Sequence, residues 1–250
     1  MKGIFDIHCH ILPGVDDGAA SMDETLRLLA LEYEDGVRSI IFTPHFRRRM
    51  FEPDMELVRE AFWQTREEAA KIYPDLNLYL GCEFHANSEM QDILKRGERP
   101  TMAGSKYVLT EFKESAEYGY VRERIQTLRT RGFRPIIAHA ERVACLKKDA
   151  AGIAELVEAG ARIQINAESI LGQEGFTVKR LCKKLMKLDL IHFVGTDAHN
   201  TRDRVPNMGK CAAYIEKKMG TAYAEKLLIE NPGKIIQEGN RTDEPGSTVY

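Results

Sequence analysis

Short apolar segments alternate with longer amphipathic segments along the chain, and this alternation constrains the fold more than any other feature. Short apolar runs bounded by turn residues predict buried strands, and apolar residues at helical spacing predict helices. Strands alternating with helices are typical of a parallel sheet covered by helices. The seven predicted strands span residues 3–7, 37–43, 76–82, 106–110, 133–138, 162–165 and 191–195.

The helices are bounded by ordinary start and stop signals. Ser21 followed three residues later by Glu24 predicts a capped helix start, and Gly36 predicts the end of that helix. Because no linker rich in Pro, Gly or Ser divides the chain, we expect one domain over residues 1–240 and a polar tail over 241–250. The predicted helices span residues 21–35, 53–73, 118–131, 149–159, 176–188, 202–219, 222–229 and 232–238.

A closed α/β barrel is favoured over a doubly wound nucleotide-binding sheet. The latter needs Gly-x-Gly-x-x-Gly after its first strand. Here the first strand leads into His8-Cys9-His10 instead.

Charge and cysteine content exclude several classes of protein. The 36 basic and 38 acidic residues give a formal net charge of −2, so no global basic field attracts nucleic acid. No apolar run reaches the length of a membrane-spanning helix, and the N-terminus shows no signal-peptide pattern. The five cysteines are scattered without a Cys-x-x-Cys, which is typical of reduced thiols. We therefore expect a cytoplasmic protein without membrane insertion.

Histidines collect where the predicted strands end. Six of the seven lie at or just past a strand's C-terminal end, and the exception, His192, is predicted to be a packed core residue. In α/β barrels this end of the strands carries the active site. Three acids also end predicted strands, and one more acid lies in a turn. Together with five of the histidines they are the candidate metal ligands: His8, His10, Asp17, His45, Glu83, Glu111, His139, Asp197 and His199.

This residue set fits a cluster of divalent ions. His8 and His10 point to one face because residues two apart in a strand do so, and imidazole and carboxylate suit divalent metals. Glu83 can bridge two ions through its two oxygens. Because three dications would outweigh four carboxylates, the surplus positive charge suits a phosphate dianion, and we expect Arg142 and Arg204 to bind its oxygens.

Six short motifs, in this order, resemble those of the polymerase and histidinol phosphatase (PHP) superfamily, and in particular of CpsB-type bacterial protein-tyrosine phosphatases. The resemblance extends from residue 4 to about 240. The motifs are His8-Cys9-His10, Asp16-Asp17-Gly18, Thr43-Pro44-His45, Gly81-Cys82-Glu83, His139-Ala140-Glu141-Arg142 and Thr196-Asp197-Ala198-His199.

The resemblance implies a distorted TIM-like (β/α)7 barrel with three divalent ions, for which we expect Mn²⁺, with Fe, Co or Zn as alternatives. It also implies a substrate, the phosphotyrosine-containing tail of a bacterial tyrosine kinase that controls capsular or exopolysaccharide synthesis. The implied ligand sets are His8, His10, Glu83 and Asp197 for one ion, Glu83, Glu111 and His139 for a second, and Asp17, His45 and His199 for a third.

One position departs from the family, because Phe46 stands where a second histidine often follows the Thr-Pro-His motif. We expect Phe46 to stack on the substrate's tyrosine ring and Arg47 to contact the substrate. The Cys-x5-Arg loop of thiol-dependent tyrosine phosphatases is absent, since no arginine lies six positions after any cysteine. We therefore expect in-line attack on phosphorus by a metal-bridging hydroxide.

Three rival interpretations remain. Another PHP phosphoesterase, such as a histidinol-phosphate phosphatase, would share most of these motifs. An amidohydrolase barrel also begins with His-x-His but usually carries a modified lysine where this chain has Glu111. A non-catalytic, metal-stabilised binding module is disfavoured because a degenerate module would lack ligands.

Overall fold

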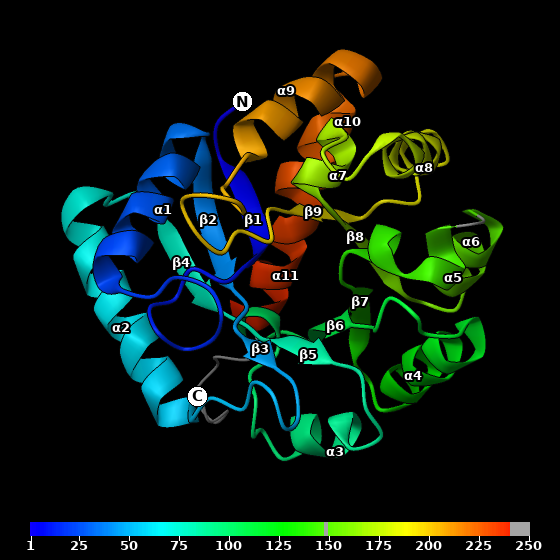
Figure 1. Cartoon of the computed structure of the whole chain (residues 1–250), viewed down its shortest axis with the longest axis horizontal. Coiled ribbons are helices and arrows are strands. Elements are labelled where there is room, and N and C mark those ends of the chain that lie inside the picture. Colours follow the sequence, from blue (N-terminus) through cyan, green and yellow to red (C-terminus); the bar gives the residue numbers. More distant parts are fainter. Residues whose placement is uncertain (148–149, 241–250) are drawn as a thin grey trace.

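The computed structural model describes residues 1–147 and 150–240, and all the paired strands in this part of the chain run parallel (Figure 1). The predicted α/β fold with a parallel sheet is confirmed. The strands are β1 (Ile4–Cys9), β2 (Val37–Phe42), β3 (His45–Phe46), β4 (Asn77–Leu80), β5 (Glu83–His85), β6 (Tyr107–Glu111), β7 (Arg134–Ile137), β8 (Arg162–Asn166) and β9 (Phe193–Gly195).

The strands form two groups, in the orders β1-β2-β4 and β3-β5-β6-β7-β8-β9. The short strands β3 and β5 were not predicted. They follow the predicted strands 37–43 and 76–82, and Pro44 separates β2 from β3 as Gly81-Cys82 separates β4 from β5. The same two chain segments remain paired across both interruptions, because β2 pairs with β4 and β3 pairs with β5. A parallel bridge between Cys9 and Ala198 joins the end of β1 to the residues that follow β9.

Helices surround the strands in Figure 1, with α1 to α9 at the periphery and α11 across the middle of the view. The predicted start of α1 is confirmed, because Ser21 accepts a hydrogen bond from the amide of Glu24. No helix within the described residues is both long and apolar enough to cross a membrane. The α-helices are α1 (Met22–Glu34), α2 (Met55–Ile72), α3 (Met90–Lys95), α4 (Tyr118–Thr130), α5 (Ala144–Lys147), α6 (Ala150–Glu158), α7 (Ala167–Leu171), α8 (Phe176–Lys187), α9 (Met208–Met219), α10 (Thr221–Glu225) and α11 (Asn231–Asn240).

Several boundaries differ from the prediction. Helix α9 begins six residues later than expected, because the side chain of Asn200 accepts hydrogen bonds from the amides of Arg202 and Asp203 and holds a turn there. The short helices α3, α5 and α7 were not predicted. Residue 149 of the predicted helix 149–159, and the predicted tail 241–250, lie outside the described residues.

The apolar core places the polar site at one end of the strands. One buried cluster fills the space between the strands and the surrounding helices. A second lies among the strands and contains Ile7, Leu109 and Ile136, against which α11 packs Ile235. Because residues near the strand starts, such as Tyr107 and Phe193, belong to this second cluster, the polar side chains are left to the opposite, C-terminal ends.

Candidate metal centre

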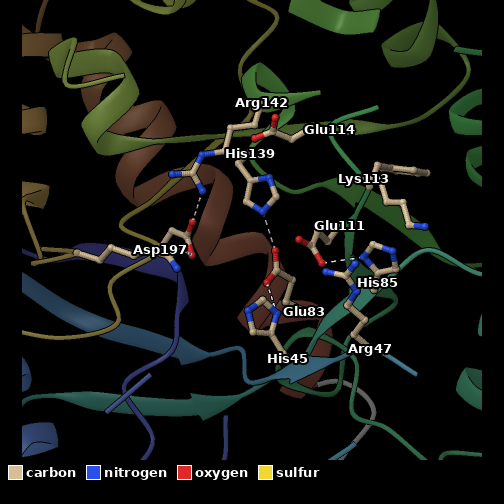
Figure 2. A pocket seen from close by; sticks show the side chains of 12 residues that line it. His45, Arg47, Glu83, His85, Glu111, Lys113, Glu114, His139, Arg142 and Asp197 are labelled. Carbon is tan, nitrogen blue, oxygen red and sulfur yellow. Dashed lines mark hydrogen bonds and ion pairs between the residues drawn. The ribbon is translucent and has the colours of Figure 1, made fainter. Parts of the chain in front are cut away.

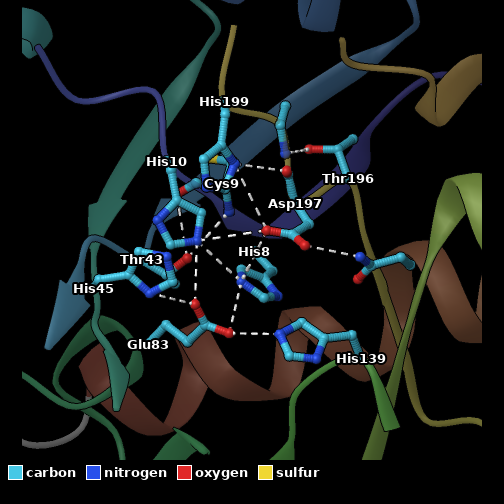
Figure 3. Close-up of polar contacts among 12 residues, drawn as sticks. His8, Cys9, His10, Thr43, His45, Glu83, His139, Thr196, Asp197 and His199 are labelled. Carbon is cyan, nitrogen blue, oxygen red and sulfur yellow. Dashed lines mark hydrogen bonds and ion pairs between the residues drawn. The ribbon is translucent and has the colours of Figure 1, made fainter. Parts of the chain in front are cut away.

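The end of β1 brings two imidazoles together, as the His-x-His spacing predicts. His8 and His10 are both buried, and their Nε2 atoms lie 3.2 Å apart (Figure 3). The Nδ1 atom of each ring lies within hydrogen-bond distance of a neighbouring polar side chain. His8 Nδ1 lies 3.2 Å from the Gln164 side-chain oxygen, and His10 Nδ1 lies 2.8 Å from the Asp16 carboxylate. Both Nε2 atoms are thereby directed into the same space.

Glu83, the first residue of β5, lies at the centre of the cluster (Figure 3). Its carboxylate is surrounded by imidazole nitrogens at 2.9 Å from His45 and His139 and at 3.3 Å from His8 and His10. Burial alone would raise the pKa of this carboxyl, but the charges of His8 and His45 hold it well below its usual range. Although burial opposes it, the Glu83 hydrogen bond raises the pKa of His139 to about 9.

Asp197 follows β9 in a strained backbone conformation, with φ of 55°. His139, after β7, has φ of 30°. Non-glycine residues in this left-handed region cost free energy and are found mostly where function requires them. One Asp197 oxygen accepts a 2.9 Å hydrogen bond from Asn166, and the carboxylate also contacts Arg142 at 2.9 Å and Arg204 at 2.6 Å.

A third part of the cluster is nearer to solvent. The Asp17 carboxylate lies 3.5 Å from His45 Nε2 and 3.6 Å from His199 Nε2. The hydrogen bond to His199 lowers the pKa of Asp17 to about 2. The loop that carries Asp17 folds closely over His10, and a Cβ atom at Gly18 would lie 1.6 Å from the His10 carbonyl oxygen. Only glycine fits there.

All nine predicted ligands lie in this cluster. They form overlapping groups whose nitrogen and oxygen atoms lie within 4.8 Å of one another. Glu111 joins through the group with His45 and Glu83, and its carboxylate accepts a 2.8 Å hydrogen bond from His85. The four groups are His10-Asp17-His45-His199, His8-His10-Asp197, His8-Glu83-His139 and His45-Glu83-Glu111.

The donor set fits divalent metal ions. Within the described residues, the buried His139 Nδ1 atom has no hydrogen-bond partner, and Glu83 Oε2 contacts the imidazoles of His10 and His45. Leaving buried polar atoms unpaired is costly. Imidazole nitrogens and carboxylate oxygens that converge in a buried site are the arrangement that a divalent cation satisfies.

A pocket of about 290 Å³ opens over this cluster (Figure 2). Arg142 and Arg204, the two predicted phosphate-binding residues, both line it, as does Arg47. Arg142 lies beside Asp197, whereas Arg47, His85 and Lys113 lie on the opposite side of the pocket in Figure 2. Nearby carboxylates raise the pKa of Arg142 despite its burial, so its guanidinium remains charged.

The interpretation of Phe46 as a platform for the substrate ring is wrong. Its side chain is 3% exposed and packs edge-on against Phe84, with ring centroids 4.8 Å apart. The guanidinium of Arg99 covers the ring at 4.3 Å. An aromatic side chain that does contact a candidate ligand is Phe51, whose ring stacks on that of His45 at 5.1 Å.

Sequence reasoning missed the polar residues that hold the ligands. On β8, Gln164 accepts a 2.7 Å hydrogen bond from the His139 amide and donates one of 2.8 Å to Asn166. The signal was present, because Gln164 and Asn166 alternate with isoleucines in Arg162–Asn166 and so share one face of the strand. Asp16 belongs to the Asp16-Asp17-Gly18 motif but is not among the predicted ligands, and it accepts hydrogen bonds from both His10 and the His45 amide.

Thiol chemistry finds no support at the site. Cys9 and Cys82 are buried, and burial raises the pKa of both thiols. Since the thiolate is the reactive form, these cysteines are poor nucleophiles.

The fold and site together define a parallel α/β protein with a candidate metal centre at the C-terminal ends of its strands. The chain belongs to the CpsB/CapC family of capsular polysaccharide synthesis, whose model matches residues 4–237.

Two relatives similar to this chain are named tyrosine-protein phosphatases. The chain is 35% identical to the tyrosine-protein phosphatase CpsB of Streptococcus pneumoniae, over 94% of this chain and 99% of that one. It is 32% identical to the tyrosine-protein phosphatase YwqE of Bacillus subtilis, over 98% and 96%. A solved structure from work on YwqE and CpsB as metal-dependent tyrosine phosphatases matches with a TM-score of 0.87 at 31% identity, covering 94% of this chain and 95% of its own.

Proposed function

We propose that this chain is a metal-dependent protein-tyrosine phosphatase that acts in the cytoplasm on the phosphotyrosine-containing tail of a bacterial tyrosine kinase governing capsule or exopolysaccharide synthesis. The observation that carries the proposal is the convergence of nine imidazole and carboxylate ligands beneath a pocket lined by Arg142 and Arg204. The names of the CpsB and YwqE relatives support the substrate class.

The proposal includes a distorted (β/α)7 barrel that forms one domain over residues 1–240. The bridge between Cys9 and Ala198 supports closure between β1 and β9. The division of β2 from β3 and of β4 from β5 accounts for the distortion.

We assign three divalent ions, with Mn²⁺ as the expected metal, to the ligand sets implied by the family. When bound, such ions polarise phosphoryl oxygens and supply a hydroxide nucleophile at neutral pH. Glu83 would hold two of these ions, since its two carboxylate oxygens each face imidazoles of the ligand sets. The sets are His8-His10-Glu83-Asp197, Glu83-Glu111-His139 and Asp17-His45-His199.

The remaining residues bind and orient the substrate. Arg142 and Arg204 lie on the Asp197 side of the pocket, where their guanidinium groups can take phosphate oxygens. His85 holds the Glu111 carboxylate in place through its hydrogen bond. Arg47 lines the opposite wall, where the rest of the substrate leaves the pocket.

The test compares three substrates with and without metal. With Mn²⁺ present we expect hydrolysis of a phosphotyrosine peptide, much slower hydrolysis of the matching phosphoserine peptide, and little turnover of histidinol phosphate. EDTA should remove the activity, whereas a thiol-alkylating reagent should leave it. Activity that survives EDTA but not alkylation, or equal rates on phosphotyrosine and phosphoserine, would contradict the proposal.

Matched variants locate the activity. Asp197→Ala and His199→Ala should abolish hydrolysis while circular dichroism remains native, because both residues follow strands above the packed core. Asp203→Ala, an exposed acid nearby, is the control and should retain activity.

A further inference from the structure

A second hollow adjoins the pocket of the metal centre. It encloses about 790 Å³ and shares Arg47, His85 and Lys113 with that pocket. Its walls come from the loops after β3, β5 and β6, together with His85 of β5 and Tyr120 of α4. A side chain that enters the metal pocket from this direction therefore leaves its flanking residues in the hollow, which we call the basic groove.

The charge of the basic groove is opposite to that of the whole chain. Its ionised lining residues are four basic side chains and one acidic one, Glu117, whereas the chain carries a formal charge of −2. The four basic residues are Arg47, Arg48, Arg49 and Lys113.

Three of these four cations are available to a ligand. Arg48 is ion-paired at 3.0 Å with both Glu52 and Glu89. No acidic partner lies within ion-pair distance of Arg47, Arg49 or Lys113 in residues 1–147 and 150–240. Uncompensated cations that converge on one groove attract an anionic ligand.

The groove is also built in advance of binding. The Arg47 and Phe51 backbones exchange two hydrogen bonds of 2.8 Å, which close the loop after β3 into a short hairpin. The Arg48–Glu89 ion pair ties this hairpin to the loop after β5. Pre-organised walls reduce the ordering cost of binding.

Apolar surface lies among these charges. The Met50 side chain is 59% exposed and the Tyr120 side chain 39% exposed, and both line the groove. Tyr120 is fixed by a 3.0 Å hydrogen bond from its hydroxyl to the Ala86 carbonyl. Cations beside an exposed aromatic ring suit a peptide segment that mixes acidic and apolar residues.

We propose that the basic groove selects substrates in which acidic residues flank the phosphotyrosine, with Arg49 and Lys113 as specificity-determining residues. This inference rests on the proposed phosphatase function and adds the sequence context of the substrate. The phosphotyrosine enters the metal pocket, and the acidic flank lies against Arg49 and Lys113.

The test measures kcat/KM for two phosphotyrosine peptides that differ only in their flanks, Asp and Glu in one and Asn and Gln in the other. With Mn²⁺-loaded wild-type enzyme at low salt, we expect kcat/KM to be about tenfold higher for the acidic peptide, since two or three exposed charge pairs contribute. The difference should arise from a lower KM. At 0.5 M salt the preference should largely disappear. Equal kcat/KM for the two peptides at low salt would overturn the inference without reference to any variant.

Arg49→Asn tests the groove directly. Residue 49 has φ of 65°, which asparagine tolerates, so this exposed loop should keep its conformation. We expect the preference to fall about threefold, the size expected for one exposed ion pair, with kcat for p-nitrophenyl phosphate unchanged because Arg49 does not line the metal pocket. Arg180→Gln, an exposed arginine on α8, is the matched control.

The outcomes separate the two proposals. If neither peptide is hydrolysed, the phosphatase function itself fails. If both are hydrolysed equally well, or if Arg49→Asn and Arg180→Gln have the same preference as the wild type, only the groove assignment fails.

Discussion

At the scale of single residues, the ligands depend on neighbours that bear no metal themselves. Asn166 donates to Asp197 at 2.9 Å, and Gln164 orients Asn166 in turn. Partners that orient a ligand typically change metal affinity by about 10–100-fold when removed. We therefore expect Asn166→Ala to raise the Mn²⁺ concentration for half-maximal activity by about that factor, with kcat at saturating Mn²⁺ reduced much less.

A metal titration followed by activity and by calorimetry measures this effect. Asn77→Ala, at an exposed position at the start of β4, serves as the control. A kcat that falls at saturating metal while the metal affinity stays unchanged would assign Asn166 to the catalytic step instead.

Residue roles were predictable where side-chain alternation in strands was respected. The histidines could be placed because strand ends meet at one edge of a parallel sheet. Phe46 was misplaced because adjacent residues in a strand point to opposite faces. With His45 directed toward Glu83, the Phe46 side chain must point away from the site and into the apolar cluster around Phe84.

At the scale of elements, α1 is attached to the base of the metal centre through a buried carboxyl pair. Glu32 of α1 and Asp6 of β1 are fully buried, and the Thr196 hydroxyl lies 2.5 Å from Asp6 and 3.3 Å from Glu32. Burial, together with the Asp6 charge and hydrogen bond, raises the pKa of Glu32 well above its usual value. Burial also raises the pKa of Asp6, so the pair retains a proton to a higher pH than a free carboxyl does.

This pair predicts a pH-dependent stability. A raised pKa in the folded state stabilises the protein below the unfolded pKa, and that stabilisation is lost as the pH rises through the folded pKa. Glu32→Gln keeps a donor for Asp6 but carries no proton to lose. We expect the free energy of unfolding of Glu32→Gln, relative to wild type, to increase from pH 5 to pH 8 in urea titrations. Glu34→Gln, exposed on the same helix, should follow the wild type, and parallel profiles for all three proteins would contradict the assignment.

Element boundaries were predictable where local signals decide them and not where pairing between strands does. The Ser21 cap follows from local hydrogen bonding, so the start of α1 was predicted. Strands β3 and β5 were missed, because they are only two and three residues long. A segment this short shows no side-chain alternation from which a strand could be predicted.

At the scale of the whole molecule, the fold separates stability from chemistry. Apolar side chains among the strands and α11 occupy one end, and the charged cluster occupies the other. Without bound ions, however, the cluster lowers the stability of the folded protein. Its carboxylates hold His139 and His10 protonated, with the pKa of His139 raised to about 9 and that of His10 also raised, although burial opposes both shifts.

Metal binding should therefore stabilise the fold, because ions satisfy these ligands only in the folded state. At a metal concentration of 100 Kd the gain is about 2.7 kcal/mol, which for a chain of this size corresponds to a rise in Tm of roughly 5–10 °C. Metal must displace the His139 proton, so the gain should be larger at pH 8 than at pH 6. Thermal unfolding with Mn²⁺ or EDTA at both pH values measures this. Asp197→Ala should lose most of the gain while Asp203→Ala keeps it, and equal gains in both variants would place the stabilising metal outside this centre.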